Sequence, residues 1–319
     1  MGSSENHLLA ENQTEVTYFI IKGFPGPPKV QLIYFSMFLL IYILTVITNA
    51  LIIIMVQLDS RLHIPMYYFL SNFSVLDTWC SSAVIPKTLS YLITNDRTIS
   101  HSGCLTQLCF VFSVGPTEFF LLTVMAYDRY LAICYPLRYA ILMNNHTCLV
   151  LAAGSWMSGF LTGWTLTIPM AMLNFCGPNL INHFFCDFIP LVKLSCSDTS
   201  TSETTFFSFA WVVVLSSLIF AAVSYSYIVK TILKIPSSIG RKKAFSTCAA
   251  HLTVIIIFYG TVIFMYVRPR ASYISDKDKL ISLFYSVITP LLNPLIYSLR
   301  NREFKQALKK VKSKFYLLC

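Results

Sequence analysis

Residues 30–58 read VQLIYFSMFLLIYILTVITNALIIIMVQL and contain no charged side chain. A helix rises 1.5 Å per residue, so about 20 apolar residues cross the hydrocarbon core of a bilayer, which is ~30 Å thick. A charge-free run of this length is too long for the core of a soluble protein. The stretch therefore predicts a membrane-spanning helix.

The composition of the whole chain agrees with a membrane protein. Its 319 residues are 55% hydrophobic and 12% charged, and the mean hydropathy is +0.64. Soluble domains average about 25% charged residues. These values exclude a disordered chain, a collagen-like chain and a small disulfide-stapled domain, and they make an ordinary soluble enzyme a poor fit.

Six further apolar stretches of spanning length follow the first one, Val30–Leu58. They are Pro65–Leu92, Cys104–Tyr135, Thr147–Leu173, Thr205–Ile235, Ala244–Val267 and Leu280–Leu299. We predict an all-α bundle of seven transmembrane helices over residues 30–300. A polar extracellular tail over residues 1–29 precedes it. Residues 301–319 are expected to form a cytoplasmic tail with a short amphipathic eighth helix on the inner leaflet, because apolar residues recur there at helical spacing.

The distribution of charge predicts the orientation. With the N-terminus outside, most of the 24 Lys and Arg residues fall on the inner loops and the C-terminal segment, as the positive-inside rule requires. The net charge of +10 then faces anionic lipid and a cytoplasmic partner, so it gives no support to nucleic-acid binding. The glycosylation pattern at Asn12 lies in the outer tail, where it can be used.

Four of the ten cysteines fall on the predicted outer side, namely Cys104, Cys176, Cys186 and Cys196. An even set in an oxidising compartment predicts two disulfides, and three pairings are open. No metal is predicted.

Two acids, Asp77 and Glu118, lie well inside the predicted spans, where ionisable side chains are functional by default. Both fall at comparable depth, so they could share a sodium ion or a proton. A proton- or ion-coupled transporter using this pair is an alternative function. Such a transporter predicts an internal repeat, and seven spans cannot be divided into two equal repeats. An enzyme is a weaker alternative, because the chain lacks a nucleophile, metal or phosphate-binding motif.

The inner end of the third span reads MAYDRYLAICYPLRY over residues 125–139. It resembles the signature of olfactory receptors, a branch of the rhodopsin-like (class A) G-protein-coupled receptors. Similar blocks follow family order: PMYYFLS at 65–71, KAFSTCAAHL at 243–252, FYGT at 258–261 and PLLNPLIYSLRN at 290–301. The Gly260-Thr261 pair resembles the tetrapod-type branch. Thr48 and Ala250 depart from the usual Gly and Ser of the family.

The resemblance implies an odorant receptor in the plasma membrane, with membrane lipids around it. It would bind a small, mostly apolar volatile molecule in the outer half of the bundle. It would then activate a stimulatory olfactory-type G protein and raise cyclic AMP. It would not be an enzyme, and it would need no cofactor beyond the sodium ion or proton. The family comparison places Asn293 next to Asp77 in the site for that ion.

The resemblance also assigns residues. It implies the disulfides Cys104–Cys186 and Cys176–Cys196. It implies a G-protein-coupling switch made of Asp128, Arg129, Tyr130, Tyr225, Lys243, Asn293, Pro294 and Tyr297. Helix register, counted back from Arg129 on the third span and compared with the fifth, sixth and seventh spans, predicts an apolar ligand pocket. Its predicted lining is Val111, Phe112, Gly115, Pro116, Phe209, Ala210, Val213, Tyr259, Val262, Ile263, Tyr266, Leu283 and Ser286.

Overall fold

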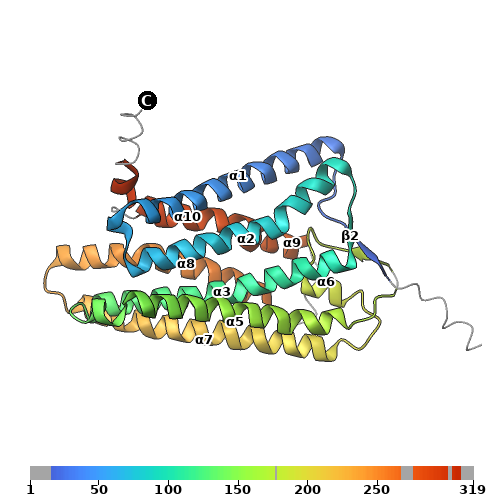
Figure 1. The fold of residues 1–319 in the computed structure, drawn as a ribbon. Helices are drawn as coiled ribbons and strands as arrows, with labels where there is room; N and C mark the ends of the chain where they lie inside the picture. The colour runs from blue at the N-terminus through green and yellow to red at the C-terminus, as the bar shows by residue number, and fades with distance from the viewer. Residues whose placement is uncertain (1–15, 177, 267–275, 301–303, 310–319) are drawn as a thin grey trace, which may run out of the picture.

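The computed structural model describes residues 16–176, 178–266, 276–300 and 304–309. Long helices lie side by side and form an elongated bundle (Figure 1). Six of them are single helices: α1 (Pro28–Leu58), α2 (Pro65–Thr94), α3 (His101–Cys134), α5 (Asn145–Ala171), α7 (Ser200–Leu233) and α8 (Ser238–Tyr266). The seventh is built from α9 (Asp276–Leu283), the π-helical segment η3 (Phe284–Ile288) and α10 (Thr289–Arg300).

Most of these helices are long and apolar enough to cross a membrane. Within the described residues, α1, α3, α5, α7 and the segment Lys279–Tyr297 meet both conditions. The segments Ser238–Ser246 and His251–Ile263 of α8, bent by 45°, qualify if they are taken as one span. At 30 residues, α2 has the length of a span but less apolar character, because it buries polar side chains such as Ser74, Asp77 and Ser81. The architecture is that of a seven-helix membrane bundle.

A small sheet joins distant parts of the chain at one end of the bundle (Figure 1). The central strand β1 (Tyr18–Ile21) pairs antiparallel with β2 (Thr98–Ser100) and parallel with β3 (Leu180–Ile181). Phe19 and Ile21 of β1 are buried while Tyr18 is half exposed, which is the alternation expected of a strand with one covered face. The sheet thus packs part of the N-terminal segment onto the bundle.

The opposite end carries short helical connections. These are η1 (Ser60–Leu62), α4 (Tyr139–Leu142) and a helical stretch over residues 304–309. Asp59 accepts from the backbone N–H of Arg61 and forms an ion pair with its guanidinium, so it closes the turn between α1 and α2. In residues 304–309, Phe304 and Ala307 are buried and Lys305 and Lys309 are exposed. This segment is therefore amphipathic.

Helix α3 occupies the middle of the bundle, where it contacts α2, α5, α7 and α8. Its approach to α5 is close because two glycines face it. A Cβ atom added at Gly159 would fall 2.6 Å from the carbonyl oxygen of Ser113, and one at Gly163 would fall 3.0 Å from that of Cys109. Small residues four positions apart let membrane helices pack backbone to backbone.

The seventh helix is anchored to α1 through one buried amide. Asn49 donates to the carbonyl oxygen of Thr45 on its own helix and to that of Pro290 on α10, at 3.0 and 3.1 Å. The carbonyl of Pro290 lies just after the π-helical turn of η3, where regular helix bonding is interrupted. Thr48 stands where the family usually has Gly, and its neighbour Asn49 still makes this contact.

The predicted spans agree with the helices to within a few residues, except at α8. That helix begins at Ser238, ahead of the expected Ala244, because its first turns are polar and extend beyond the apolar run. The expected tail over residues 1–29 contains β1 and the start of α1. Asn12, and all of residues 301–319 apart from 304–309, lie outside the described residues.

Candidate functional site

A cavity of about 100 Å³ lies between α2, α3, α5, α7, α8 and η3. Its wall is mainly aliphatic and aromatic, and four side chains in it carry a polar group: Cys80, Glu118, Thr162 and Tyr285. The remaining lining residues are Val111, Phe112, Val114, Gly115, Pro116, Phe119, Leu166, Phe206, Phe209, Ala210, Val213, Val214, Phe258 and Val262. A cavity of ~150 Å³ holds benzene, so this space suits a compact ligand.

The register prediction of the pocket agrees with the cavity on α3 and α7, agrees in part on α8, and departs from the cavity on the seventh helix. Val111, Phe112, Gly115, Pro116, Phe209, Ala210, Val213 and Val262 line the cavity. Tyr259, Ile263, Leu283 and Ser286 lie outside its lining, and the side chain of Tyr266 lies outside the described residues. Tyr259 packs beside the cavity, because its ring contacts that of Phe119 with centroids 5.0 Å apart.

The π-helical turn accounts for the difference on the seventh helix. A π-turn holds one residue more than an α-turn, so it rotates the residues on one side of it relative to those on the other. Tyr285, inside η3, takes the place expected for Leu283 and Ser286. The hydroxyl of Ser286 instead donates to the carbonyl oxygen of Ser282, 2.6 Å away, on its own helix.

The loop between α5 and α7 packs against the wall of the cavity and is held by disulfides. Cys104 on α3 is bonded to Cys186, and Cys176 is bonded to Cys196, as the family resemblance implies. The short helix α6 (Phe188–Val192) follows Cys186. Phe188 at its start stacks on Phe206 of the cavity wall, with ring centroids 4.0 Å apart.

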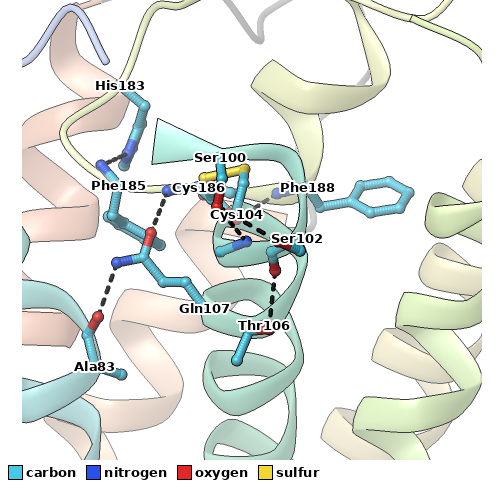
Figure 2. Close-up of a disulfide and its surroundings, with 12 residues drawn as sticks. Ala83, Ser100, Ser102, Cys104, Thr106, Gln107, His183, Phe185, Cys186 and Phe188 are labelled. Atoms are coloured by element: carbon cyan, nitrogen blue, oxygen red, sulfur yellow. Dashed lines mark hydrogen bonds between the residues drawn. A yellow bond between two sulfur atoms is a disulfide. The ribbon is translucent and has the colours of Figure 1, made fainter. Parts of the chain in front are cut away.

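Gln107 ties this loop to two helices (Figure 2). Its side-chain oxygen accepts from the backbone N–H of Cys186 at 2.8 Å, and its amide donates to the carbonyl oxygen of Ala83 on α2 at 2.7 Å. The side-chain amide is buried, and both its oxygen and its nitrogen are hydrogen-bonded, so it fixes the loop beside the disulfide. No sequence motif points to this role, because a single Gln has no signature of its own.

His183 in the same loop is also buried. Its Nε2 lies 3.1 Å from the hydroxyl of Ser282 on α9, and its ring stacks on that of Phe184. Burial and the positive charge of Lys279 lower the pKa of His183 to about 3. The imidazole is therefore neutral at physiological pH and joins the loop to the seventh helix.

The two buried acids lie on neighbouring helices, Asp77 on α2 and Glu118 on α3. One oxygen of Asp77 accepts from the amide of Asn293 at 3.0 Å, and its other oxygen is buried without a hydrogen-bond partner among the described residues. Glu118 is close enough for the two carboxyl groups to interact electrostatically. The predicted grouping of Asp77, Glu118 and Asn293 thus exists as a spatial cluster.

At the other end of the bundle, Asp128 is fully buried and accepts from the hydroxyl of Tyr139 on α4 at 2.7 Å. No ion pair with its neighbour Arg129 is found in the described part of the chain. Burial and the charge of Asp128 raise the pKa of Tyr139, so the phenol stays protonated and keeps donating. Asp128 therefore anchors the loop helix α4.

Arg129 faces a different set of groups. It interacts electrostatically with Tyr225, His251 and Tyr297, and its Nε has no hydrogen-bond partner among the described residues. Tyr225 and His251 are hydrogen-bonded to each other. Sequence reasoning missed His251 as a functional residue, although it lies within the quoted block at 243–252.

The remaining switch residues are spread around this cluster. The ring of Tyr130 packs between those of Tyr135 and Tyr227, with centroids 5.6 and 5.8 Å away, and so does not join Arg129. Pro294 lies inside α10 and Tyr297 is buried. The side chain of Lys243 lies outside the described residues.

Comparison with known proteins gives one answer. A family profile described as "Olfactory receptor" matches residues 38–314. The chain is 48% identical to mouse olfactory receptor 6B9 over 300 residues, covering 94% of this chain and 95% of that one. It is 47% identical to human olfactory receptor 6Y1, covering 95% and 93%, and 48% identical to human olfactory receptor 6F1, covering 94% and 97%.

These proteins are receptors rather than enzymes, and the match covers the helices, the cavity and the buried clusters. Coupling of a small-molecule ligand to a G protein is the general property of this class of membrane protein. The bundle, its apolar cavity and the near full-length similarity together place the chain in the olfactory receptor family of multi-pass G-protein-coupled receptors.

Proposed function

We propose that the chain is a plasma-membrane odorant receptor whose ligand site is the cavity between α3, α5, α7 and α8. The ligand is small and mostly apolar. Binding activates a stimulatory olfactory-type G protein and raises cyclic AMP. The observation that carries the proposal is the cavity itself, because it is compact and mostly apolar, and a disulfide-bonded loop packs against its wall.

One helix links the ligand site to the cytoplasmic end. Phe258 and Val262 of α8 line the cavity, and His251 of the same helix bonds to Tyr225 beside Arg129. Phe258 and His251 are seven residues apart, or about 10 Å along the helix axis. A ligand that contacts Phe258 more favourably in one position of α8 shifts the population toward that position. The contacts of Arg129 then change with it.

The cluster of Asp77, Glu118 and Asn293 fits a sodium ion or a proton. The unpartnered, buried oxygen of Asp77 is the kind of group that a cation or a proton satisfies. Bound there, either one supplies positive charge between the two carboxyl groups. In this proposal, its release accompanies the shift of the seventh helix, on which Asn293 lies next to Pro294. Asn12 is proposed as the glycosylated residue of the outer tail, and Lys243 as part of the G-protein surface.

The test is ligand-dependent cyclic AMP accumulation in cells that express the chain, with a panel of odorants. Arg129→Ala is expected to abolish the response at equal surface expression. Arg138→Ala removes an exposed arginine nearby and serves as the matched control. A full response from Arg129→Ala at equal expression would contradict the proposed coupling.

A further inference from the structure

We propose that Glu118 is the polar anchor of the ligand, and that the receptor recognises a compact alcohol or phenol through its hydroxyl group. The inference rests on the proposed function of the cavity and adds the chemical class of its ligand. It gives Glu118 a second role, in addition to the one in the ion cluster.

The placement of Glu118 carries the proposal. It lines the cavity, its exposed fraction is 7%, and it makes no hydrogen bond to any described residue. The neighbouring acid Asp77 differs, because it accepts from Asn293 and does not line the cavity. A buried carboxyl group without a protein partner needs one from elsewhere, and the cavity is where a partner can arrive.

The other polar groups of the wall compete weakly for a ligand. The hydroxyl of Thr162 already donates to the carbonyl oxygen of Ser158 at 2.8 Å. The thiol of Cys80 is a weak donor and a weak acceptor. Tyr285 offers a neutral hydroxyl, which hydrogen-bonds less strongly than an ionised carboxylate. Glu118 is therefore the strongest hydrogen-bond acceptor that a ligand in this cavity meets.

A hydroxyl group suits Glu118 in either protonation state. It donates to the ionised carboxylate, and it accepts from the protonated acid. A hydrocarbon of the same size does neither and leaves the carboxyl group unsatisfied. A hydrogen bond to a charged group contributes enough to separate the two ligands by about tenfold to a hundredfold in binding constant.

The rest of the wall sets the size and shape of the ligand. Residues Val111 to Phe119 of α3 line the cavity over about 12 Å of helix, and Glu118 lies toward the inner end of this stretch. The ring of Phe119 contacts that of Phe258, with centroids 4.7 Å apart. The body of the ligand therefore packs on apolar side chains toward α6, and its hydroxyl group points inward.

The experiment compares isosteric pairs on the purified full-length receptor in detergent. The probes are benzyl alcohol against ethylbenzene and 1-hexanol against heptane, and thermal stabilisation is measured as a function of probe concentration. Each alcohol is compared with its hydrocarbon on the wild type, Glu118→Gln and Glu118→Leu. Glu203→Gln is the control for the same change of charge on α7, outside the cavity. Each probe partitions into detergent to the same extent for every variant, so comparing variants with one probe removes this effect.

We expect the wild type and Glu203→Gln to prefer each alcohol over its hydrocarbon by about tenfold or more. Glu118→Gln should reduce that preference, and Glu118→Leu should abolish it while keeping the response to the hydrocarbons. An equal response to both members of each pair on the wild type, or an unchanged preference in Glu118→Leu, would overturn the inference and leave the apolar cavity standing. No stabilisation by any of the four probes would overturn the cavity as the ligand site.

Discussion

The hydroxyl of Tyr225 on α7 lies 2.7 Å from Nδ1 of His251 on α8. Both side chains are buried, and Nε2 of His251 has no partner among the described residues. The pair connects the two helices beside Arg129, at the end of the bundle that meets the G protein in the proposed mechanism. It joins Tyr225 of the predicted switch to α8.

Removing one member of this pair should alter signalling. Tyr225→Phe leaves the ring of His251 without its hydroxyl partner, and the cost of an unsatisfied buried group is about 1–3 kcal/mol. We expect a change of roughly fivefold or more in the balance of basal to ligand-stimulated cyclic AMP. Tyr227→Phe, on an exposed side chain of the same helix, is the control. Identical signalling by both variants would show that the hydrogen bond has no part in switching.

The contact of α5 with α3 should tolerate no side chain at Gly159. Gly159→Ala places a methyl group against the backbone of α3, and overpacking of this kind costs about 1–3 kcal/mol. Surface expression and the thermal midpoint of the purified receptor should both fall. Gly154→Ala lies on the same helix with open space at its Cβ, and it should behave as the wild type. Equal losses from the two variants would indicate a general effect of replacing glycine.

The disulfide between Cys104 and Cys186 closes a segment of 82 residues. By the chain-entropy estimate such a bond stabilises the folded state by roughly 4–5 kcal/mol. Cys104→Ser should therefore abolish most surface expression. Cys109→Ser, which replaces a free cysteine on the same helix, should preserve it. Flow cytometry of an N-terminally tagged receptor measures both variants.

Acid should weaken the outer loop through His183. Its pKa is about 3 in the folded state, below the ordinary value of 6.5, so the unfolded state binds one more proton between these values. Stability is complete above pH 6.5 and falls as the pH decreases toward 3, by at most about 1.4 kcal/mol per pH unit. His183→Gln should flatten the dependence of the thermal midpoint on pH in this window. His63→Gln, on an exposed side chain, should leave the dependence unchanged.

The sequence predicted the helices well because apolar runs and charges mark where a span begins and ends. It also placed the cavity wall on α3, because Arg129 fixes the register of that helix. Register failed on the seventh helix, where the π-turn at Phe284–Ile288 has no simple signature. The bonds of Gln107 and His183 also escaped prediction, because each depends on partners brought together by the fold.

The strand β1 sets an order of events during synthesis. Ile20 pairs with Leu180, so one edge of the first strand cannot be completed until 160 more residues have been made. At about 5–20 residues per second this takes roughly 8–32 s. During that time the segment around Phe19 has one side without its final partner. The sheet at the outer end of the receptor is therefore completed long after its central strand has been translated.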